Sequence, residues 1–352
     1  MTDAYSGSTV LVTGATGLIG SAIVYTLLER GDVRVIAASR SQDKLNTCFG
    51  RYFEHRNFST IVQDASQPLH VQEPVHYIFH AAGPIASNII RHKPLQVISP
   101  NLFGLQNCLE FLREQKEYRG ILGRIIIFSS ATVYGHRIGE NTSVCEDDTQ
   151  LAEALNERTA AYSEVKRMAE VLGLAYSREY SMDVVIARFS YVYGCPEIEP
   201  ATAFFDIANK VLCGEDIEIL NPEQAILDYI FVTDAVNGVL QVGARGRRGE
   251  AYNISSNGEL GCYVSMDQLA KHMIDIANTN RVDANKLCLH FPTGGIQRKN
   301  GIKMNNQKLK QLGWHLSTSI QDGIEQVLLC KRMRMERGTA TTGQNMERKI
   351  IP

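Results

Sequence analysis

In Thr9-Val-Leu-Val-Thr-Gly14-Ala-Thr-Gly17-Leu-Ile-Gly20, an apolar strand runs directly into regularly spaced glycines and then into an amphipathic helix. Gly14 permits a tight turn between strand and helix, and Gly17 lets the backbone approach a pyrophosphate without a Cβ in the way. Gly20 allows the helix to lie close on the sheet. A pyrophosphate would then bind at the helix N-terminus, where unpaired N–H groups and the helix dipole favour an anion. The stretch therefore predicts a dinucleotide-binding turn.

The length and charge of the chain limit the function classes open to it. At 352 residues the sequence suits one large domain or two closely joined ones. The formal net charge of −2 provides no global basic field, so we expect no nucleic-acid partner. The eight cysteines include no Cys-x-x-Cys and no zinc-like spacing with histidine. They therefore predict reduced thiols and no metal site.

The N-terminal sequence and the hydropathy pattern predict a cytoplasmic protein. Met1 is followed by polar residues and an acid at Asp3, where a signal peptide needs basic residues and an apolar run. No segment reaches the ~18 consecutive apolar residues of a spanning helix, so we expect no association with a membrane.

Apolar β-branched runs alternate with helical stretches along the first half of the chain. The expected strands are residues 10–13, 33–38, 61–62, 77–80, 124–129 and 183–189, and the expected helices are residues 19–30, 100–115 and 162–179. This alternation predicts an α/β fold of the Rossmann type, a doubly wound parallel sheet with helices on both faces. We place this dinucleotide-binding domain at residues 1–192 and a smaller C-terminal substrate lobe at 193–331. Residues 332–352 are polar and lack an apolar period, which predicts a disordered tail.

Several polar side chains are expected at the carboxyl end of this sheet. Tyr162 and Lys166 lie four residues apart on a predicted helix, so both project from one face. Nearby positive charge lowers the pKa of a phenol, which would let Tyr162 exchange protons near neutral pH. The buried strand 124–129 ends in hydroxyls, and Ser130 is suited to hydrogen-bond a substrate oxygen. The combination predicts hydride exchange with a nicotinamide, assisted by proton transfer at Tyr162.

The order and spacing of these motifs resemble the extended short-chain dehydrogenase/reductase family, in its nucleotide-sugar epimerase/dehydratase branch. The similarity extends over residues 10–327. Besides the glycine turn, it is carried by Asp64-Ala65, His80-Ala81-Ala82-Gly83, Asn101 with Gly104 and Asn107, segments 128–135 and 188–194, Tyr162-Ser-Glu-Val-Lys166, segment 228–234, and Leu312-Gly313-Trp314. The resemblance implies an NAD(P)-dependent enzyme that acts on a nucleotide sugar. It also implies a homodimer in which helices 100–115 and 162–179 of two subunits form a four-helix bundle.

The resemblance assigns roles to individual residues. It implies that Ser130, Tyr162 and Lys166 are catalytic, with Lys166 also binding the nicotinamide ribose. It places Asp64 at the adenine and the backbone of Ala81 and Ala82 beneath the cofactor. The full set of implied cofactor contacts is Gly14, Thr16, Gly17, Leu18, Ile19, Ser39, Arg40, Asp64, Ala65, Ala81, Ala82, Gly83, Tyr162 and Lys166. The implied substrate contacts are Ser130, Thr132, Tyr191 and Arg298.

The residues that follow Ser130 bear on the reaction. Members of the branch that dehydrate or decarboxylate carry a carboxylate in this stretch, whereas this chain has Ala131 and Thr132. A methyl and a hydroxyl cannot replace a carboxylate that moves a proton at sugar C5 or C6. The sequence therefore favours an epimerase or a 4-ketoreductase, which transfers hydride at C4.

Two other interpretations stay open. Segments 80–101 and 162–170 look most like the UDP-glucuronate decarboxylases, although residues 129–135 have the form of the UDP-galactose 4-epimerases. Decarboxylase or dehydratase chemistry would need a carboxylate from elsewhere, such as Glu164 or the acidic run 146–148, which we expect to be a solvated loop. A catalytically silent dinucleotide-binding regulator is the remaining alternative.

Cofactor choice is indicated by the end of the second predicted strand. NAD-preferring members of the family place an Asp there, whereas this chain has Ser39 and Arg40. No acid repels a 2′-phosphate at this position, and Arg40 is able to bind one. The sequence therefore predicts NAD(P) binding with a slight preference for NADP(H).

The substrate lobe also departs from the family. Leu227 stands where an Arg usually grips a phosphate, and Tyr191 stands where an Asn is usual. Arg298 remains as a candidate phosphate ligand. His80 and His136 are expected near the crevice as packed or surface histidines.

Overall fold

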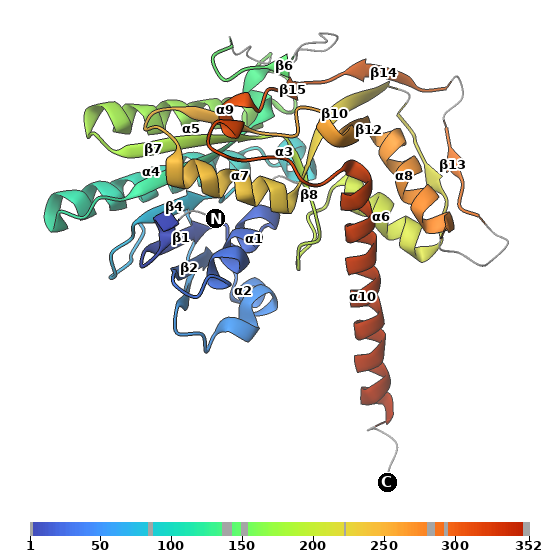
Figure 1. Cartoon of the computed structure of the whole chain (residues 1–352), viewed down its shortest axis with the longest axis horizontal. Coiled ribbons are helices and arrows are strands. Elements are labelled where there is room, and N and C mark those ends of the chain that lie inside the picture. The colour runs from blue at the N-terminus through green and yellow to red at the C-terminus, as the bar shows by residue number, and fades with distance from the viewer. Residues whose placement is uncertain are drawn as a thin grey trace.

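A seven-stranded parallel sheet forms the centre of the computed structural model, which describes residues 3–83, 87–135, 143–148, 154–221, 223–279, 286–291 and 295–347. The strand order is β11-β7-β5-β4-β1-β2-β3 (Figure 1). The strands are β1 Thr9–Thr13, β2 Arg34–Ser39, β3 Phe58–Val62, β4 Tyr77–His80, β5 Arg124–Ser130, β7 Asp183–Phe189 and β11 Ala251–Ile254. The chain changes direction across the sheet between β1 and β4. Ligands of open α/β sheets bind at such a switch point, outside the carboxyl ends of the strands.

Helices cover both faces of the sheet because successive strand residues point to opposite sides. Val10 and Val12 of β1 belong to the core beneath α1 and α7, whereas Leu11 belongs to the core beneath α4 and α5. The helices of this half are α1 Leu18–Leu28, α2 Gln42–Phe49, α3 Ser87–His92, α4 Leu95–Arg119, α5 Ala160–Glu179 and α7 Val232–Arg245. The predicted doubly wound Rossmann fold is thereby confirmed.

A smaller unit lies beside the carboxyl edge of the main sheet (Figure 1). Its sheet joins β12-β10-β14, with β8 also paired to β10. The elements are β8 Tyr191–Tyr193, α6 Ala203–Cys213, β10 Glu223–Phe231, β12 Tyr263–Ser265, α8 Met266–Thr279, β14 Gln297–Asn300 and α10 Ile320–Glu347. Two small sheets pair β9 Ile217–Glu218 with β13 Leu289–His290, and β6 Ser143–Val144 with β15 Lys303–Met304. The short helix α9 Gln307–Lys310 and the 3₁₀ turns η1 Asp3–Tyr5, η2 Gly50–Tyr52, η3 Ala131–Tyr134 and η4 Glu259–Gly261 complete the described elements.

The expected strands 77–80 and 183–189 coincide with β4 and β7. The helix expected from residue 100 begins earlier, at Leu95, and contains Pro100. Asn101 directly after it is 2% exposed and donates from Nδ2 to the carbonyl of Val97 at 2.7 Å. The chain beyond residue 193 does not stay in the smaller unit, because α7 and β11 return to the main sheet.

The last described helix differs from the tail expected beyond residue 331. α10 continues to Glu347, and in Figure 1 its last turns extend away from the rest of the protein. Cys330 on this helix forms a disulfide with Cys195, which corrects the expectation of reduced thiols for these two residues, while the other six cysteines are free. Lys331 and Arg334 form ion pairs with acids at residues 199 and 197, and these contacts hold the helix beyond the disulfide.

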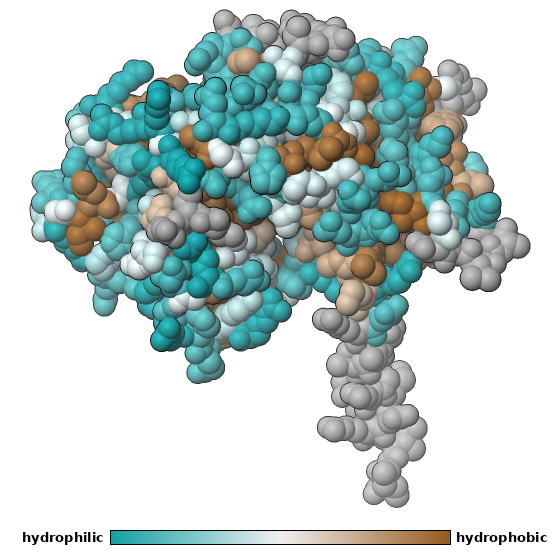
Figure 2. Space-filling model, viewed as in Figure 1, coloured by the Kyte–Doolittle hydropathy of each residue, from teal (hydrophilic) through white to brown (hydrophobic). Residues whose placement is uncertain are grey.

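The surface drawn in Figure 2 is mostly hydrophilic, and its hydrophobic residues gather in small patches. None of the helices in the described ranges combines the length and the apolar character that crossing a bilayer requires.

Candidate active site

The glycine turn between β1 and α1 has little room for side chains. Gly14 has φ +63°, and a Cβ there would lie 2.7 Å from the carbonyl carbon and oxygen of Ala81 and 2.8 Å from the Cα of Ala82. A Cβ on Gly20 would overlap the carbonyl oxygen of Gly14. Gly17 is the N-cap of α1 and offers no side chain to cap it. The first N–H groups of α1 therefore have no side-chain cap, and such groups are able to bind a phosphate.

The end of β2 lies next to this turn. The hydroxyls of Ser39 and Thr16 are 3.3 Å apart, and Ser39 is buried. Arg40, directly after it, is exposed. This is the place at which the end of the second strand meets the adenosine ribose in dinucleotide-binding folds.

Asp64 and Ala65 follow β3. The Asp64 carboxylate accepts hydrogen bonds from the backbone N–H and the hydroxyl of Ser66, at 2.9 and 2.8 Å. These bonds lower the pKa of Asp64, and the charge of Arg40 adds to the effect. The carbonyl of Ala65 accepts from Asn107 Nδ2 at 2.9 Å, which attaches this loop to α4.

The segment after β4 passes under the glycine turn. The N–H of Ala81 donates to the carbonyl of Thr13 at 3.2 Å. A Cβ on Gly83 would lie 2.8 Å from the side-chain amide of Asn101, so α4 approaches this backbone closely. The expected cofactor residues of β1, β2 and β4 are thus adjacent in the structure.

His80, at the end of β4, is 3% exposed. Its Nδ1 lies 3.0 Å from the hydroxyl of Thr13, and its Nε2 is buried with no partner among the described residues. Burial lowers the pKa of His80 to about 3, and the charge of Lys166 acts in the same direction. His80 is therefore a neutral, packed histidine. His136 lies outside the described residues.

Ser130, Tyr162 and Lys166 meet at the carboxyl end of β5. Ser130 is the last residue of the strand, and its Oγ accepts from the N–H of Thr132 at 3.3 Å. A hydrogen bond also links its side chain to Tyr162. The Lys166 ammonium lies 5.8 Å from the centre of the Tyr162 ring and donates to the carbonyl of Phe128 at 2.8 Å.

Burial dominates the protonation of these groups. It raises the pKa of Tyr162, against the opposite effect of the Ser130 hydrogen bond. This direction differs from the expected lowering by Lys166, because desolvation of the phenolate prevails. Burial also lowers the pKa of Lys166 to about 8, while the charge of Glu170 raises it.

No carboxylate follows Ser130 in η3. Thr132 Oγ1 is buried and has no partner among the described residues. Of the expected alternative acids, Glu164 lies on α5 and pairs with Arg167 at 3.5 Å. In the acidic run 146–148, Asp147 and Asp148 are exposed, whereas Glu146 is half-buried: its carboxylate accepts from the N–H of Asn253 at 2.8 Å and burial raises its pKa.

The expected substrate residues of the smaller unit are more dispersed. The Tyr191 ring on β8 lies 4.7 Å from that of Tyr229 on β10. Arg298 on β14 forms an ion pair with Asp267 and donates from Nε to Ser265 Oγ at 3.2 Å. The candidate phosphate ligand is thus bound to a protein acid, although its side chain remains 43% exposed.

Two residues next to the site were not among the expected ones. Glu170 and Arg188 form an ion pair in which each side chain is only 6% exposed. Glu170 follows Lys166 by four residues, so the helical spacing that linked Tyr162 to Lys166 also places Glu170 on that face. Among the described residues, no group of three or more His, Cys, Asp or Glu side chains is placed to hold a metal ion.

Comparison with known proteins places these features in a family. The model of the "NAD dependent epimerase/dehydratase family" matches residues 10–255. UDP-glucuronic acid decarboxylase 6 of Arabidopsis thaliana is 27% identical over 325 residues, which cover 91% of this chain and 87% of the relative.

Solved structures show the same fold. A dTDP-glucose 4,6-dehydratase from Bacillus anthracis, solved with NAD, is 21% identical with a TM-score of 0.75, covering 94% of this chain and 98% of its own. A UDP-glucuronic acid 4-epimerase from Bacillus cereus, solved with UDP-glucuronic acid and NAD, is 21% identical with a TM-score of 0.73, covering 92% of this chain and 99% of its own.

Proposed function

Because this chain belongs to the NAD dependent epimerase/dehydratase family, we propose that it is a nucleotide-sugar epimerase or 4-ketoreductase that transfers hydride at C4. The observation that carries the proposal is the meeting of Ser130, Tyr162 and Lys166 at the same carboxyl edge of the sheet as the glycine turn, with no carboxylate in η3. A nicotinamide dinucleotide supplies the hydride donor or acceptor when bound. Ser130 orients the sugar oxygen, and Tyr162 gives or takes its proton.

Lys166 has two tasks in this proposal. Its ammonium binds the ribose hydroxyls of the cofactor, and its charge favours the phenolate of Tyr162 whenever that hydroxyl has released its proton. Its hydrogen bond to the carbonyl of Phe128 supports both tasks, because it holds the side chain at the end of β5. Thr132, Tyr191 and Arg298 contact the substrate in the same proposal.

The test is a product assay with matched variants. Purified protein is incubated with UDP-glucose or UDP-glucuronic acid and NAD, and the sugar products are resolved by NMR. We expect Tyr162→Phe to abolish turnover and Ser130→Ala to reduce it by ~10²–10⁴, the range of general acid–base catalysis. Tyr180→Phe is the control and should be fully active, because Tyr180 is exposed and lies at the C-terminal end of α5, far along the helix from Tyr162. An active Tyr162→Phe variant would refute Tyr162 as the acid/base of the reaction, whereas a wild type that binds NAD and turns over no nucleotide sugar would support a non-catalytic dinucleotide-binding regulator.

A decarboxylase is the second candidate, and the similarity to UDP-glucuronic acid decarboxylase 6 favours it. It is distinguished by UDP-glucuronic acid labelled with ¹³C at C6. Release of labelled CO₂ would support decarboxylation, whereas retention of the label in a C4 epimer would support the primary proposal.

We propose a slight preference for NADP(H), supported by Arg40 and by the absence of an acid at the end of β2. NADH and NADPH are titrated by fluorescence against wild type and Arg40→Ala. The proposal requires NADPH to bind more tightly to wild type and the variant to lose that difference. Equal affinities in wild type would refute it.

We further propose a homodimer in which α4 and α5 of two subunits form a four-helix bundle. The two helices pack on each other, and each presents exposed apolar side chains, Phe103 on α4 and Met168 and Val171 on α5. Val171→Glu should give a monomer in light scattering, whereas Leu260→Glu, at an exposed leucine on η4, should not.

We also propose that the protein is cytoplasmic, and cell fractionation tests this location.

A further inference from the structure

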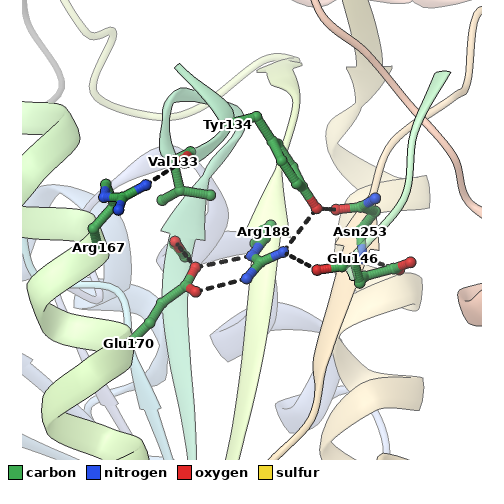
Figure 3. Close-up of polar contacts among 8 residues, drawn as sticks. Val133, Tyr134, Glu146, Arg167, Glu170, Arg188 and Asn253 are labelled. Atoms are coloured by element: carbon green, nitrogen blue, oxygen red, sulfur yellow. Dashed lines mark hydrogen bonds and ion pairs between the residues drawn. The ribbon is translucent and has the colours of Figure 1, made fainter. Parts of the chain in front are cut away.

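A buried ion pair lies directly behind the proposed catalytic residues. Arg188 on β7 donates from Nε to Glu170 Oε1 at 3.0 Å and from Nη2 to Oε2 at 2.8 Å. Both side chains are almost fully buried. Two charges removed from water in this way need a complete set of partners, because an unpaired buried charge is costly. Figure 3 shows these partners converging on Arg188: Glu170 from α5, the Tyr134 hydroxyl from the turn after β5, and the carbonyl of Glu146.

Glu170 joins two of the elements that carry the site. It accepts a third hydrogen bond from the hydroxyl of Ser129 at 2.5 Å, so it holds the end of β5 one residue before Ser130. On α5 it lies one turn after Lys166, on the same face. The position of Ser130 relative to Lys166 therefore depends on this carboxylate together with the hydrogen bond from Lys166 to the carbonyl of Phe128.

Arg188 connects this pair to the turn after β5. Its Nη1 donates to the Tyr134 hydroxyl at 2.8 Å and to the carbonyl of Glu146 at 2.9 Å. The Tyr134 hydroxyl donates in turn to Asn253 Oδ1 at 2.7 Å (Figure 3). Because Tyr134 is the last residue of η3, the same network fixes the turn that carries Thr132.

We propose that Glu170 and Arg188 are positioning residues that together hold Ser130, Thr132 and Lys166 in place. The inference deepens the proposed function and rests on it for the roles of those three residues. Neither Glu170 nor Arg188 contacts a reacting atom in this proposal.

The charges around Lys166 agree with this role. From β4 it faces His80, which is neutral, and from β5 it faces the carbonyl of Phe128. From α5 it faces the Tyr162 ring and Glu170, while Arg188 on β7 is screened from it by its bonds to Glu170. Glu170 is therefore the negative charge that opposes desolvation of the ammonium, and its effect on the pKa of Lys166 is upward.

The test uses the full chain and the variant Glu170→Gln, which keeps the shape of the side chain and removes its charge. The matched control is Asp183→Asn, because Asp183 on β7 pairs with Arg124 on β5 at 2.8 Å, at the end of these strands that lies away from Ser130. Lysines labelled with ¹³C at Cε are titrated by NMR without substrate, and Lys166→Arg identifies the Lys166 signal. The pH profile of kcat is then recorded on the nucleotide sugar that proves active.

We expect the Lys166 pKa, and with it the alkaline limb of kcat, to fall by about 1 pH unit in Glu170→Gln and to stay unchanged in Asp183→Asn. A residue with a merely structural role would lower activity at every pH without moving this pKa. An unshifted Lys166 signal in Glu170→Gln overturns the proposal.

If Glu170→Gln does not fold, the double variant Glu170→Met with Arg188→Met replaces the pair by apolar side chains of similar volume, a change that buried ion pairs tolerate. We expect the pKa of Lys166 to fall in this double variant as well. An unshifted Lys166 signal would again overturn the proposal. The titration needs no substrate, so it is independent of the proposed function. The proposed function is refuted on its own if the Tyr162→Phe variant stays active while the Lys166 signal shifts in Glu170→Gln.

Discussion

Replacing Gly14 by alanine should abolish dinucleotide binding and strongly destabilise the fold. Two separate costs contribute. At φ +63° a residue with a Cβ is strained by about 1–2 kcal/mol. The added Cβ also meets backbone atoms of Ala81 and Ala82 at 2.7–2.8 Å, and these cannot rotate aside as a side chain would.

Relief of this overlap would displace the segment after β4. Forced overpacking costs about 1–3 kcal/mol, and loss of the bond from the Ala81 N–H to Thr13 adds about 1 kcal/mol. The total is about 3–6 kcal/mol. Gly7→Ala isolates the first cost, because Gly7 has φ +68° but no atom within 4 Å of the added Cβ. It should lose only about 1–2 kcal/mol.

Urea unfolding followed by circular dichroism gives both free energies, and quenching of tryptophan fluorescence by NADH reports binding through Trp314. We expect Gly7→Ala to bind NADH as wild type does and Gly14→Ala not to bind it. If the two variants are equally stable and bind NADH equally, the close approach of the turn to Ala81 does not shape the site.

Three further outcomes follow from other contacts. The disulfide between Cys195 and Cys330 closes a loop of 135 residues, so its reduction should lower the free energy of unfolding by roughly 5 kcal/mol. Mass spectrometry that finds eight free thiols before reduction would contradict the bond. His80 has a pKa of about 3 in the fold and about 6.5 when unfolded, so the unfolded chain binds its proton first as the pH falls. Wild type should therefore lose about 2 kcal/mol more stability than His80→Gln between pH 7 and pH 5, and equal losses in urea titrations would refute a buried neutral His80. If Arg298 binds a substrate phosphate, Asp267→Asn should release the Arg298 guanidinium from its ion pair and lower KM, while Arg298→Ala should raise KM. Steady-state kinetics that show neither change would exclude Arg298 from the substrate site.

The main sheet could be predicted from the sequence because its pattern is local. Strands buried on both faces appear as continuous apolar runs, and the expected ranges 77–80 and 183–189 coincide with β4 and β7. The smaller unit gave no such signal. β8 has only three residues, and β10 finds its partners β12 and β14 far along the chain, so their pairing depends on tertiary contacts.

The site shows the same division. Ser130 and the pair Tyr162 and Lys166 belong to short contiguous motifs whose geometry follows from strand and helix periods. The residues that pair behind this site do not belong to short contiguous motifs, so their pairing could not be predicted from the sequence. The bond between Glu170 and Arg188 joins a helix to a strand, and the pairing of Cys195 with Cys330 is set by where α10 packs. A polar tail sequence likewise gives no sign of the ion pairs that hold Lys331 and Arg334 on that helix.

The missing carboxylate in η3 does not weigh equally against the two alternative reactions. Dehydration removes a proton from C5 and protonates a leaving hydroxyl at C6, and both steps need groups that Ala131 and Thr132 cannot supply. Decarboxylation differs, because oxidation at C4 turns a glucuronate into a β-keto acid, which loses CO₂ without a base. Ser130 and Tyr162 would then only have to stabilise the developing enolate oxygen.

The structure therefore disfavours dehydration more strongly than decarboxylation. Glu146 offers no substitute acid, since its carboxylate is already bound to the backbone of Asn253. We accordingly expect no 4-keto-6-deoxy product from UDP-glucose in wild type, measured by NMR. Formation of that product would show that another group, such as Glu164, supplies the acid. Loss of CO₂ from UDP-glucuronic acid without such a product would instead show that the hydroxyls of this site suffice once C4 is oxidised.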